Sequence, residues 1–216
     1  MSDGDSVKVF YPQLCDYATK TSCSAGTLLD DLWRLTRHHI HGGHMLCGPV
    51  VGRFLQLIIR LQKPSLCFEL GTFTGYSALH IAQALSTDAK LITCERNPIG
   101  VEIAKDYFQR SGVGHKIDLW FMDFFEAMNQ IDTPIDFAFI DGNKRAYPDY
   151  HEALLKNMRS GSVIMYDNTL FNGAVLDPND APSKVINEFN HFLVNDTRVE
   201  NVHLTIMDGL QLVQIK

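Results

Sequence analysis

The sequence predicts an α/β fold built on a mainly parallel sheet. From Pro64 onward, short apolar runs alternate with longer segments of helical spacing, and few polar residues interrupt the runs. Apolar strands joined by helices are typical of a parallel sheet that helices cover on both faces. A chain of 216 residues favours one domain, and we expect residues 1–48 to form a helical or lid segment and residues 64–216 the core.

The individual elements follow from the same alternation. The expected parallel strands are residues 66–70, 91–95, 116–121, 137–140 and 162–166, and the expected helices between them are residues 77–86, 98–111, 124–131 and 148–159. Another helix is expected between Pro49 and Pro64, because proline suits a first helical turn and several apolar residues there share one face: Val51, Phe54, Leu55 and Ile58.

The C-terminal tail has a different pattern. A helix is expected over residues 183–194, followed by strands over residues 199–207 and 210–215. Asp208-Gly209 separates these two strands, and Asp-Gly between strands is typical of a tight hairpin. The sheet is therefore expected to contain seven strands and to close with an antiparallel one.

Composition excludes some classes of protein. Lys and Arg total 19 against 25 Asp and Glu, a formal net charge of -6, which argues against general binding to nucleic-acid phosphates. The start, MSDGDSVKVF, lacks a basic stretch followed by an apolar run, and no membrane-length apolar segment occurs. The five cysteines form no CxxC pair and are expected to be reduced and mostly buried. We expect a cytoplasmic protein without a membrane partner.

Four expected strands end in, or next to, an acidic residue: Glu69, Glu95, Asp141 and Asp167. A single acid there could simply cap the next helix. Four together favour a polar site, because ligands of open α/β sheets bind at the carboxyl ends of the strands. Glu95 follows the second strand, where a carboxylate suits the two hydroxyls of a ribose.

A glycine turn, residues 71–75, joins the first strand to its helix. It lacks the GxGxxG spacing of dinucleotide sites, and the chain has no GxxxxGK[ST] phosphate loop. Gly71 permits close approach of the backbone to a ligand, and Glu69 lies two residues earlier. An acid combined with backbone amides favours a cationic ligand that carries an amino acid, such as S-adenosylmethionine. The alternative is a plain strand-to-helix turn.

Asp141, Asp167 and Asn168 form a third candidate group. Two carboxylates and an amide oxygen from neighbouring strand ends would leave Mg²⁺ partly open to water or substrate oxygens. Such a metal lowers the pKa of a bound hydroxyl. Lys144 follows Asp141 by three residues and could take the proton or stabilise the resulting oxyanion, although a lysine is usually a solvated surface charge.

Three segments together resemble one family: FELGTFTGYSALHIAQAL, FAFIDGNKRAYPDYHEALL and GSVIMYDNTLFNGAV. They are similar to the metal-dependent class I O-methyltransferases, which include catechol and caffeoyl-CoA O-methyltransferases. The resemblance extends from about Met45 to the C-terminus. It implies a Rossmann-like, seven-stranded methyltransferase fold, S-adenosylmethionine, a divalent cation that is usually Mg²⁺, and often a homodimer.

The resemblance also assigns roles to residues. Those implied to bind the cofactor are Met45, Glu69, Gly71, Thr72, Ser77, Glu95, Asp123, Phe124 and Asp141. The implied metal ligands are Asp141, Asp167 and Asn168. Lys144 and Asp141 are the implied catalytic residues, and the implied substrate residues are Lys144, Phe171 and Asn172. Departures from the family pattern include DGNK in place of a DADK-like motif, Phe124 at a usually small position, and Cys47 where plant members often have threonine.

Three functions remain open at this point. The expected one is methylation of a hydroxyl on a catechol-like small molecule with vicinal oxygens. A CoA ester is less favoured, because the N-terminal third offers few cations for its phosphates. The alternatives are methylation of hydroxylated uridine in tRNA, which the acidic charge disfavours, and S-adenosylmethionine binding without catalysis. The histidines at positions 38, 39, 41 and 44 are interpreted as lid or surface residues rather than a metal site, because no acid or cysteine accompanies them.

Overall fold

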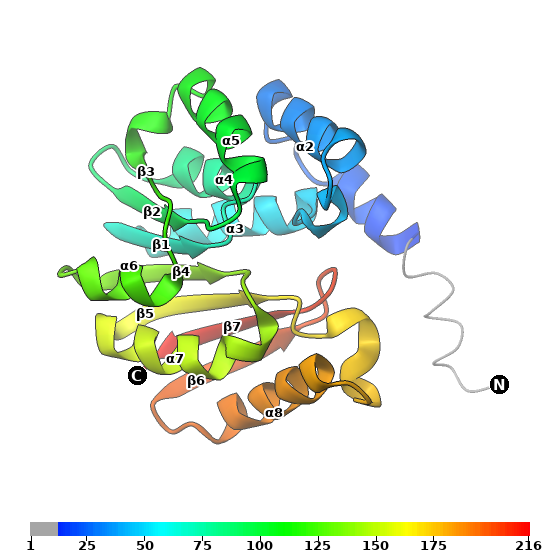
Figure 1. The fold of residues 1–216 in the computed structure, drawn as a ribbon, viewed down its shortest axis with the longest axis vertical. Helices are drawn as coiled ribbons and strands as arrows, with labels where there is room; N and C mark the ends of the chain where they lie inside the picture. The colour runs from blue at the N-terminus through cyan, green and yellow to red at the C-terminus, as the bar shows by residue number, and fades with distance from the viewer. Residues whose placement is uncertain (1–12) are drawn as a thin grey trace.

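The computed structural model describes residues 13–216, in which one seven-stranded sheet lies between two layers of helices (Figure 1). The strand order is β3-β2-β1-β4-β5-β7-β6. The first five strands are parallel, and β7 runs antiparallel to both β5 and β6. The strands are β1 (Leu66–Leu70), β2 (Lys90–Cys94), β3 (Ile117–Trp120), β4 (Ile135–Ile140), β5 (Met158–Asp167), β6 (Val199–Leu204) and β7 (Leu210–Ile215). The expected sheet is confirmed.

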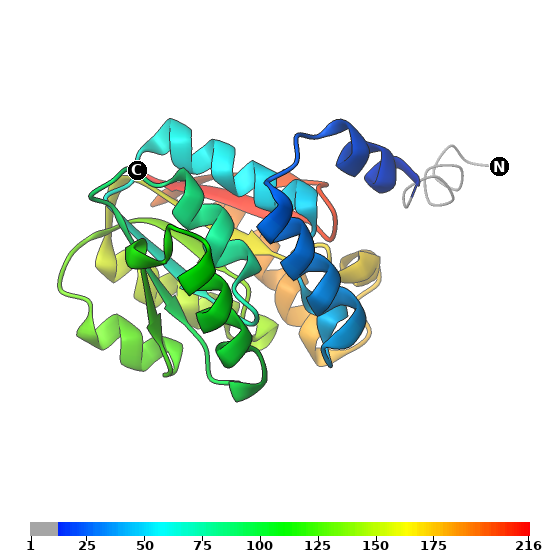
Figure 2. The same cartoon turned by 90° about the horizontal axis from the view of Figure 1, so that it is seen from above.

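Helices cover both faces of this sheet (Figure 2). After residue 26, the α-helices are α2 (Thr27–His39), α3 (Pro49–Gln62), α4 (Tyr76–Ala84), α5 (Pro98–Arg110), α6 (Phe124–Gln130), α7 (Tyr147–Asn157) and α8 (Ala181–Asn195). Short 3-10 turns are η1 (Gly43–Met45), η2 (Gly114–Lys116), η3 (Lys144–Ala146) and η4 (Phe171–Leu176). Residues 13–21 are also helical.

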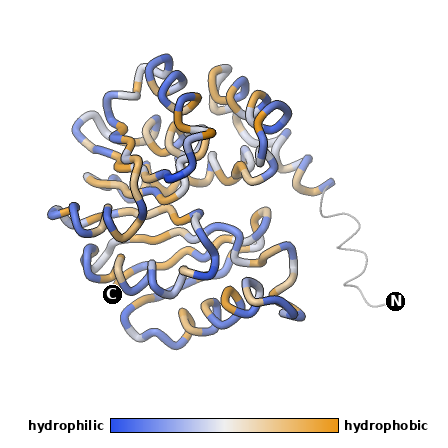
Figure 3. The backbone as a smooth tube through the Cα atoms, viewed as in Figure 1, coloured by the Kyte–Doolittle hydropathy of each residue, from blue (hydrophilic) through white to orange (hydrophobic). Residues whose placement is uncertain are grey.

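Strand β4 shows why apolar runs mark the central strands. Phe137 and Phe139 point into the core with α2 to α5, whereas Ala138 and Ile140 point into the core with α6 to α8. Because successive side chains of a strand alternate between faces, a strand covered on both faces needs an apolar residue at nearly every position. Figure 3 shows the resulting concentration of hydrophobic colour along the strands.

The C-terminal hairpin differs from the prediction. β6 ends at Leu204 and β7 begins at Leu210, so the connection has five residues rather than two. The reason is a distant contact: the N–H groups of Thr169 and Leu170 donate to the carbonyl oxygens of Gly209 and Asp208, at 3.1 and 2.8 Å. The connection is therefore bound to the segment after β5. Its tight turn spans residues 206–209, with the Gly209 N–H donating to the Ile206 carbonyl oxygen at 2.9 Å, so it is centred on Met207-Asp208 rather than on Asp208-Gly209.

Two smaller expectations also need correction. β5 begins at Met158, four residues before the expected start, because residues 159–161 are exposed and polar or glycine and so hide the strand from a search for apolar runs. Among the cysteines, which are all free, only Cys67 and Cys94 are buried. The prediction that residues 1–10 do not form a targeting segment concerns residues outside those described. Within residues 13–216, no helix is long and apolar enough to cross a bilayer.

Candidate active site

The carboxyl ends of β1, β4 and β5 lie next to one another at one edge of the sheet. The register pairs Leu70 with Ile140, and Ile140 with Tyr166. Asp141 and Asp167 each come directly after these aligned positions. The structure therefore brings the two acids together, as the parallel topology predicts.

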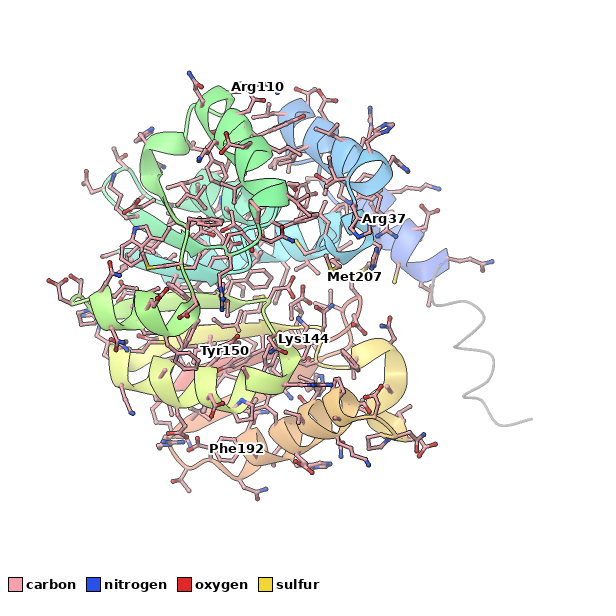
Figure 4. The ribbon with its side chains drawn as sticks, in the orientation of Figure 1. Arg37, Arg110, Lys144, Tyr150, Phe192 and Met207 are labelled. Carbon is pink, nitrogen blue, oxygen red and sulfur yellow. The ribbon has the colours of Figure 1, made fainter. Side chains whose placement is uncertain are left out.

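Lys144 lies in contact with this acidic end (Figure 4). Its Nζ donates to Asp141 Oδ1 at 2.5 Å and to the hydroxyl of Tyr147 at 2.9 Å. The Tyr147 hydroxyl is itself 2.8 Å from the carbonyl oxygen of Asp167 and 3.1 Å from that of Ile140, to which it can donate. Tyr147 thus connects the lysine to the ends of both β4 and β5. Sequence reasoning missed this role, because a buried tyrosine in α7 has the pattern of a core residue.

The charge state of Lys144 follows from these neighbours. Burial lowers the pKa of the amine, but the negative charge of Asp141 and the contact with Tyr147 outweigh burial, and the net pKa is raised. Lys144 is therefore an ammonium at neutral pH in this arrangement. A group in that state can hold an anionic oxygen and cannot accept a proton.

Asp167 is a buried carboxylic acid, with 4% of its surface exposed. Burial raises its pKa, the negative charge of Asp141 raises it further, and Lys144 partly offsets both, so that the pKa reaches about 7. The backbone N–H of Asn168 donates to Asp167 Oδ1 at 2.7 Å. Asn168 has a φ of 56°, a left-handed conformation that asparagine tolerates better than most residues.

The oxygen donors at this end are few. Within residues 13–216, no group of three or more His, Cys, Asp and Glu side chains is arranged to hold a metal ion. A cation here would therefore need the amide oxygen of Asn168 beside Asp141 and Asp167. Two carboxylates and one amide are hard oxygen donors of the kind that Mg²⁺ prefers, and Lys144 supplies a single positive charge beside the two carboxylates. The donor set fits such a cation in chemical type.

Glu69 lies near the end of β1 and is fully buried. Its Oε2 accepts a hydrogen bond from the Thr93 hydroxyl at 2.5 Å, whereas its Oε1 has no hydrogen-bond partner. Burial raises the pKa of Glu69 to about 7, against the opposing effects of the Ser77 and Thr93 hydroxyls. A buried carboxylate oxygen without a partner is costly, and a cationic donor from a ligand would satisfy it.

The glycine turn does not present its amides as expected. The N–H groups of Gly71 and Thr72 donate to the carbonyl oxygen of Cys94, at 3.0 and 3.3 Å, and that of Phe73 donates to Glu95 Oε2 at 2.8 Å. These three N–H groups therefore already have protein acceptors, supplied by the last residue of β2 and by Glu95 directly after it. Gly71 has a φ of 103°, and a Cβ there would approach the Asp141 carbonyl oxygen to 2.4 Å. Glycine is therefore required at position 71, so that the ends of β1 and β4 can pack together.

Glu95 is fixed by the backbone around it. Besides the bond from Phe73, its Oε1 accepts from the N–H groups of Arg96 and Asn97, both at 2.7 Å. A carboxylate has about four acceptor positions, so capacity for a ribose hydroxyl remains. Asp123 caps α6 through the N–H of Glu126 at 2.9 Å.

Phe124 points away from the sheet edge. Its ring packs on Phe68 and Tyr150, with centroids 5.7 and 4.4 Å apart, and only 2% of its surface is exposed. The side chain is thus part of the core, and only its backbone can face a ligand. This explains how a bulky residue is accommodated at a position that is usually small.

The hinge before α3 contributes Met45 and Cys47. Met45 is 59% exposed. Burial raises the pKa of the Cys47 thiol, and the negative charges of Asp167, Asp141 and Glu69 raise it further. Cys47 is therefore within electrostatic range of these three acids, although the sequence marks it only as a departure from the family pattern.

The loop between β6 and β7 completes this edge of the sheet. The N–H of Asn172 donates to Asp208 Oδ1 at 2.5 Å, and both Phe171 and Asn172 have left-handed backbone, with φ of 49° and 53°. Met207, labelled in Figure 4, lies against the hinge, since a Cβ on Gly48 would be 3.2 Å from its Cε. Sequence reasoning missed Met207 and Asp208, because their partners are far away along the chain.

The four histidines at positions 38, 39, 41 and 44 are all exposed. His38 and His39 lie in the last turn of α2, where a positive charge is favourable. No metal-binding group is found among them in the part of the chain that the structure describes. They are surface residues of the N-terminal segment, as interpreted from the sequence.

Comparison with known proteins identifies the family. The family described as O-methyltransferase matches residues 19–216. Caffeoyl-CoA O-methyltransferase of Zinnia elegans is 36% identical over 198 residues, which cover 85% of this chain and 80% of that enzyme. The chain belongs to the O-methyltransferase family. Another O-methyltransferase, caffeoyl-CoA O-methyltransferase 2 of Zea mays, is 38% identical over 175 residues, 74% of this chain and 66% of that enzyme.

Solved structures of other methyltransferases share the fold. A methyltransferase of Podospora anserina bound to SAH has a TM-score of 0.88 at 22% identity, and the alignment covers 100% of this chain and 97% of that one. The O-methyltransferase TomG of Streptomyces achromogenes, in complex with SAM, has a TM-score of 0.84 at 26% identity, over 94% and 96% of the two chains. The expected family, fold class and class of enzyme are confirmed.

Proposed function

We propose that this chain transfers the methyl group of S-adenosylmethionine to a hydroxyl of a small aromatic molecule with vicinal oxygens, with the help of a divalent cation such as Mg²⁺. The observation that carries the proposal is the common edge at which the unpartnered Glu69 Oε1 and the cluster of Asp141, Lys144 and Asp167 lie. Glu69 Oε1 suits the cationic methyl donor, and the cluster suits the anionic oxygen of the methyl acceptor.

The donor half is supported by the groups around Glu69. The α-ammonium of S-adenosylmethionine would satisfy Glu69 Oε1, and Ser77 lies nearby. Glu95 retains capacity for one ribose hydroxyl, and Asp123 lies at the start of α6 where the adenine is expected. Gly71, Thr72, Met45 and the backbone of Phe124 remain proposed neighbours of the cofactor. TomG and the Bacillus cereus O-methyltransferase, 26% and 25% identical to this chain, have been solved with SAM and SAH.

The acceptor half is supported by charge. Asp141, Asp167 and Asn168 would hold the cation, which when bound orients two adjacent substrate oxygens and lowers the pKa of the reacting hydroxyl. The Lys144 ammonium, held by Asp141 and Tyr147, would then stabilise the developing oxyanion. Its raised pKa favours this role over that of a proton acceptor while the pair with Asp141 is intact. Phe171 and Asn172 are proposed to border the substrate.

The reaction itself is a single displacement. The substrate hydroxyl releases its proton to solvent, since the Lys144 ammonium cannot accept it. The substrate oxygen then forms a bond to the methyl carbon as the carbon–sulfur bond breaks, and the products are a methyl ether and S-adenosylhomocysteine. The chain's main contribution would be to place oxygen, carbon and sulfur in line at roughly 3 Å. The two halves of the site suit this task, because β1 and β4 are adjacent strands with aligned ends.

A transfer assay with labelled S-adenosylmethionine tests the proposal. Catechols, hydroxycinnamoyl-CoA esters and bulk tRNA serve as acceptors, each with Mg²⁺ and with EDTA. We expect Mg²⁺-dependent methylation of a catechol. Turnover that survives chelation would contradict the metal dependence. Methylation of tRNA alone would contradict the proposed substrate class. Tight binding of S-adenosylmethionine without turnover on any acceptor would contradict catalysis.

A further inference from the structure

The face of β6 and β7 that lies under α8 is apolar at one end and polar at the other (Figure 1). Val199 and Val213 of this face belong to the core that α8 covers. Three polar side chains continue the same face toward the end of β5: Asn201, His203 and Gln211. Gln211 is 1% exposed, and its register partner in β5 is Tyr166, the residue before Asp167. The polar end of the face therefore lies next to the strand end that carries Asp167.

Hydrogen bonds join these polar side chains into one network. Gln211 Nε2 donates to Asn190 Oδ1 on α8 at 3.1 Å, and Asn201 Nδ2 donates to Gln211 Oε1 at 3.0 Å. Asn190 Nδ2 in turn donates to the carbonyl oxygen of Thr169 at 2.8 Å. His203 Nε2 shares a hydrogen bond of 3.0 Å with the Thr169 hydroxyl. Both branches of the network therefore end on Thr169.

Thr169 is held at each of its polar groups. It is fully buried, and besides the contacts with Asn190 and His203 its N–H donates to the carbonyl oxygen of Gly209 at 3.1 Å. A buried polar network is rigid when its members all have partners, and apolar side chains could cover the same face without needing any. The network therefore fixes the position of the Thr169 backbone.

Asn168 directly precedes Thr169 and supplies the one amide among the proposed metal ligands. Its backbone is left-handed, with a φ of 56°, and its N–H donates to Asp167 Oδ1. Within residues 13–216, no hydrogen bond is made by the side-chain amide of Asn168 itself. The direction of that amide therefore depends on the backbone on either side of it, which is β5 on one side and Thr169 on the other.

We propose that Asn190 and His203 are positioning residues for the divalent cation, because they fix Thr169 and with it the backbone that carries the Asn168 amide. The inference rests on the proposed function, in which Asp141, Asp167 and Asn168 hold the cation. It adds that α8 and β6, which supply none of these three ligands, contribute to the affinity for the metal. Loss of hydrogen bonds that support metal ligands typically lowers metal affinity about 10- to 100-fold.

Binding of Mn²⁺ to the full chain tests the proposal without turnover. Mn²⁺ prefers the same oxygen ligands as Mg²⁺, and the electron paramagnetic resonance signal of free Mn²⁺ reports how much is bound. The wild type is expected to bind Mn²⁺, and Asn190→Leu to raise the dissociation constant about tenfold, because leucine is similar in size and donates no hydrogen bond. Asn195→Leu is the matched control on the same helix, since the exposed Asn195 amide donates within α8, to the His191 carbonyl oxygen at 2.8 Å.

The hydroxyl of Thr169 provides a second pair of variants. Thr169→Val removes the contact with His203 at nearly constant size and is expected to weaken Mn²⁺ binding several-fold, whereas Thr169→Ser keeps the hydroxyl and should bind Mn²⁺ nearly as the wild type does. Circular dichroism shows whether each variant folds. Calorimetry measures the affinity for S-adenosylmethionine, which is expected to change little, because Glu69 and Glu95 do not contact the network.

The outcomes separate this inference from the proposed function. Asn190→Leu and Thr169→Val that bind Mn²⁺ as the wild type does would overturn the positioning role and leave the proposed function in place. The same conclusion follows if Asn195→Leu weakens Mn²⁺ binding equally, if Thr169→Ser behaves like Thr169→Val, or if the affinity for S-adenosylmethionine falls as much as that for Mn²⁺. A wild type that binds no Mn²⁺ would overturn the metal in the proposed function, and this inference with it.

Discussion

The glycine turn and the acidic end of β4 and β5 lie at the same edge of the sheet but use their polar groups in opposite ways. In the turn, the N–H groups of Gly71, Thr72 and Phe73 already have protein acceptors. At the acidic end, Asp141 and Asp167 share a single ammonium, and the pKa of Asp167 is raised to about 7. These three N–H groups of the turn therefore have acceptors before any ligand binds, whereas the acidic end has one ammonium for two acids.

The largest expected effect comes from removing charge at the acidic end. Asp167→Asn takes away one of the two carboxylates proposed to hold the cation, so we expect methyl transfer to fall at least about 100-fold while the affinity for S-adenosylmethionine changes little. Labelled-methyl transfer and calorimetry measure the two quantities. Asp132→Asn, at an exposed position, is the control. Transfer within a few-fold of the wild type would show that this end does not act through its charge.

The next effect isolates the ammonium. Lys144→Met is expected to lower kcat about 100-fold, because the oxyanion loses its charged donor. Lys144→Arg should not restore kcat, since a planar guanidinium cannot replace a point charge between Asp141 and Tyr147. Steady-state kinetics at saturating S-adenosylmethionine provide the measurement. A normal kcat in Lys144→Met would show that Lys144 does not stabilise the oxyanion.

The pH dependence of the free energy of unfolding tests the burial of Glu69. Its pKa rises from 4.5 in the unfolded chain to about 7 in the folded one, mainly because of burial. The stability that protonated Glu69 contributes is thus fully present below pH 4.5 and is lost as the pH rises through 7. Relative to the wild type, Glu69→Gln should gain up to roughly 3 kcal/mol in free energy of unfolding between pH 5 and pH 8. Urea denaturation at both values tests this, and an equal difference at the two would contradict it. Weaker S-adenosylmethionine binding by the same variant would support its ligand role.

Tyr147 should give the smallest effect on activity. Tyr147→Phe removes the hydroxyl that contacts Lys144 and the carbonyl oxygens of Ile140 and Asp167, so we expect a loss of about 1–3 kcal/mol in stability and a few-fold loss in kcat. Thermal denaturation and kinetics measure both. Tyr17→Phe, at a side chain that is 67% exposed, is the control. Unchanged stability would mean that the tyrosine does not join the two strand ends.

The sequence predicted the fold well because burial on both faces leaves a clear record in β4, where every residue is buried. It also predicted that Asp141 and Asp167 would meet, because parallel strands bring their carboxyl ends to one edge. These inferences need only local pattern and topology. They do not depend on the partner of any particular atom.

The remaining features depend on partners that are distant along the chain. The amides of the glycine turn are occupied by Cys94 and Glu95, more than twenty residues away. Asp208 is 36 residues from Asn172, and its side chain accepts a hydrogen bond from the Asn172 N–H. Local pattern does not encode such pairings, so the sequence did not show that these amides have protein acceptors, and it placed the turn between β6 and β7 at Asp208-Gly209 rather than at Met207-Asp208.

The position of β7 has a consequence for biosynthesis. The last strand of the chain inserts between β5 and β6, and the loop that precedes it contacts both the segment after β5 and the hinge before α3. While residues 205–216 are still inside the ribosome, β6 has no neighbour in the sheet and the candidate active site lacks the loop between β6 and β7. The nascent protein should therefore be inactive until residues 205–216 have left the ribosome.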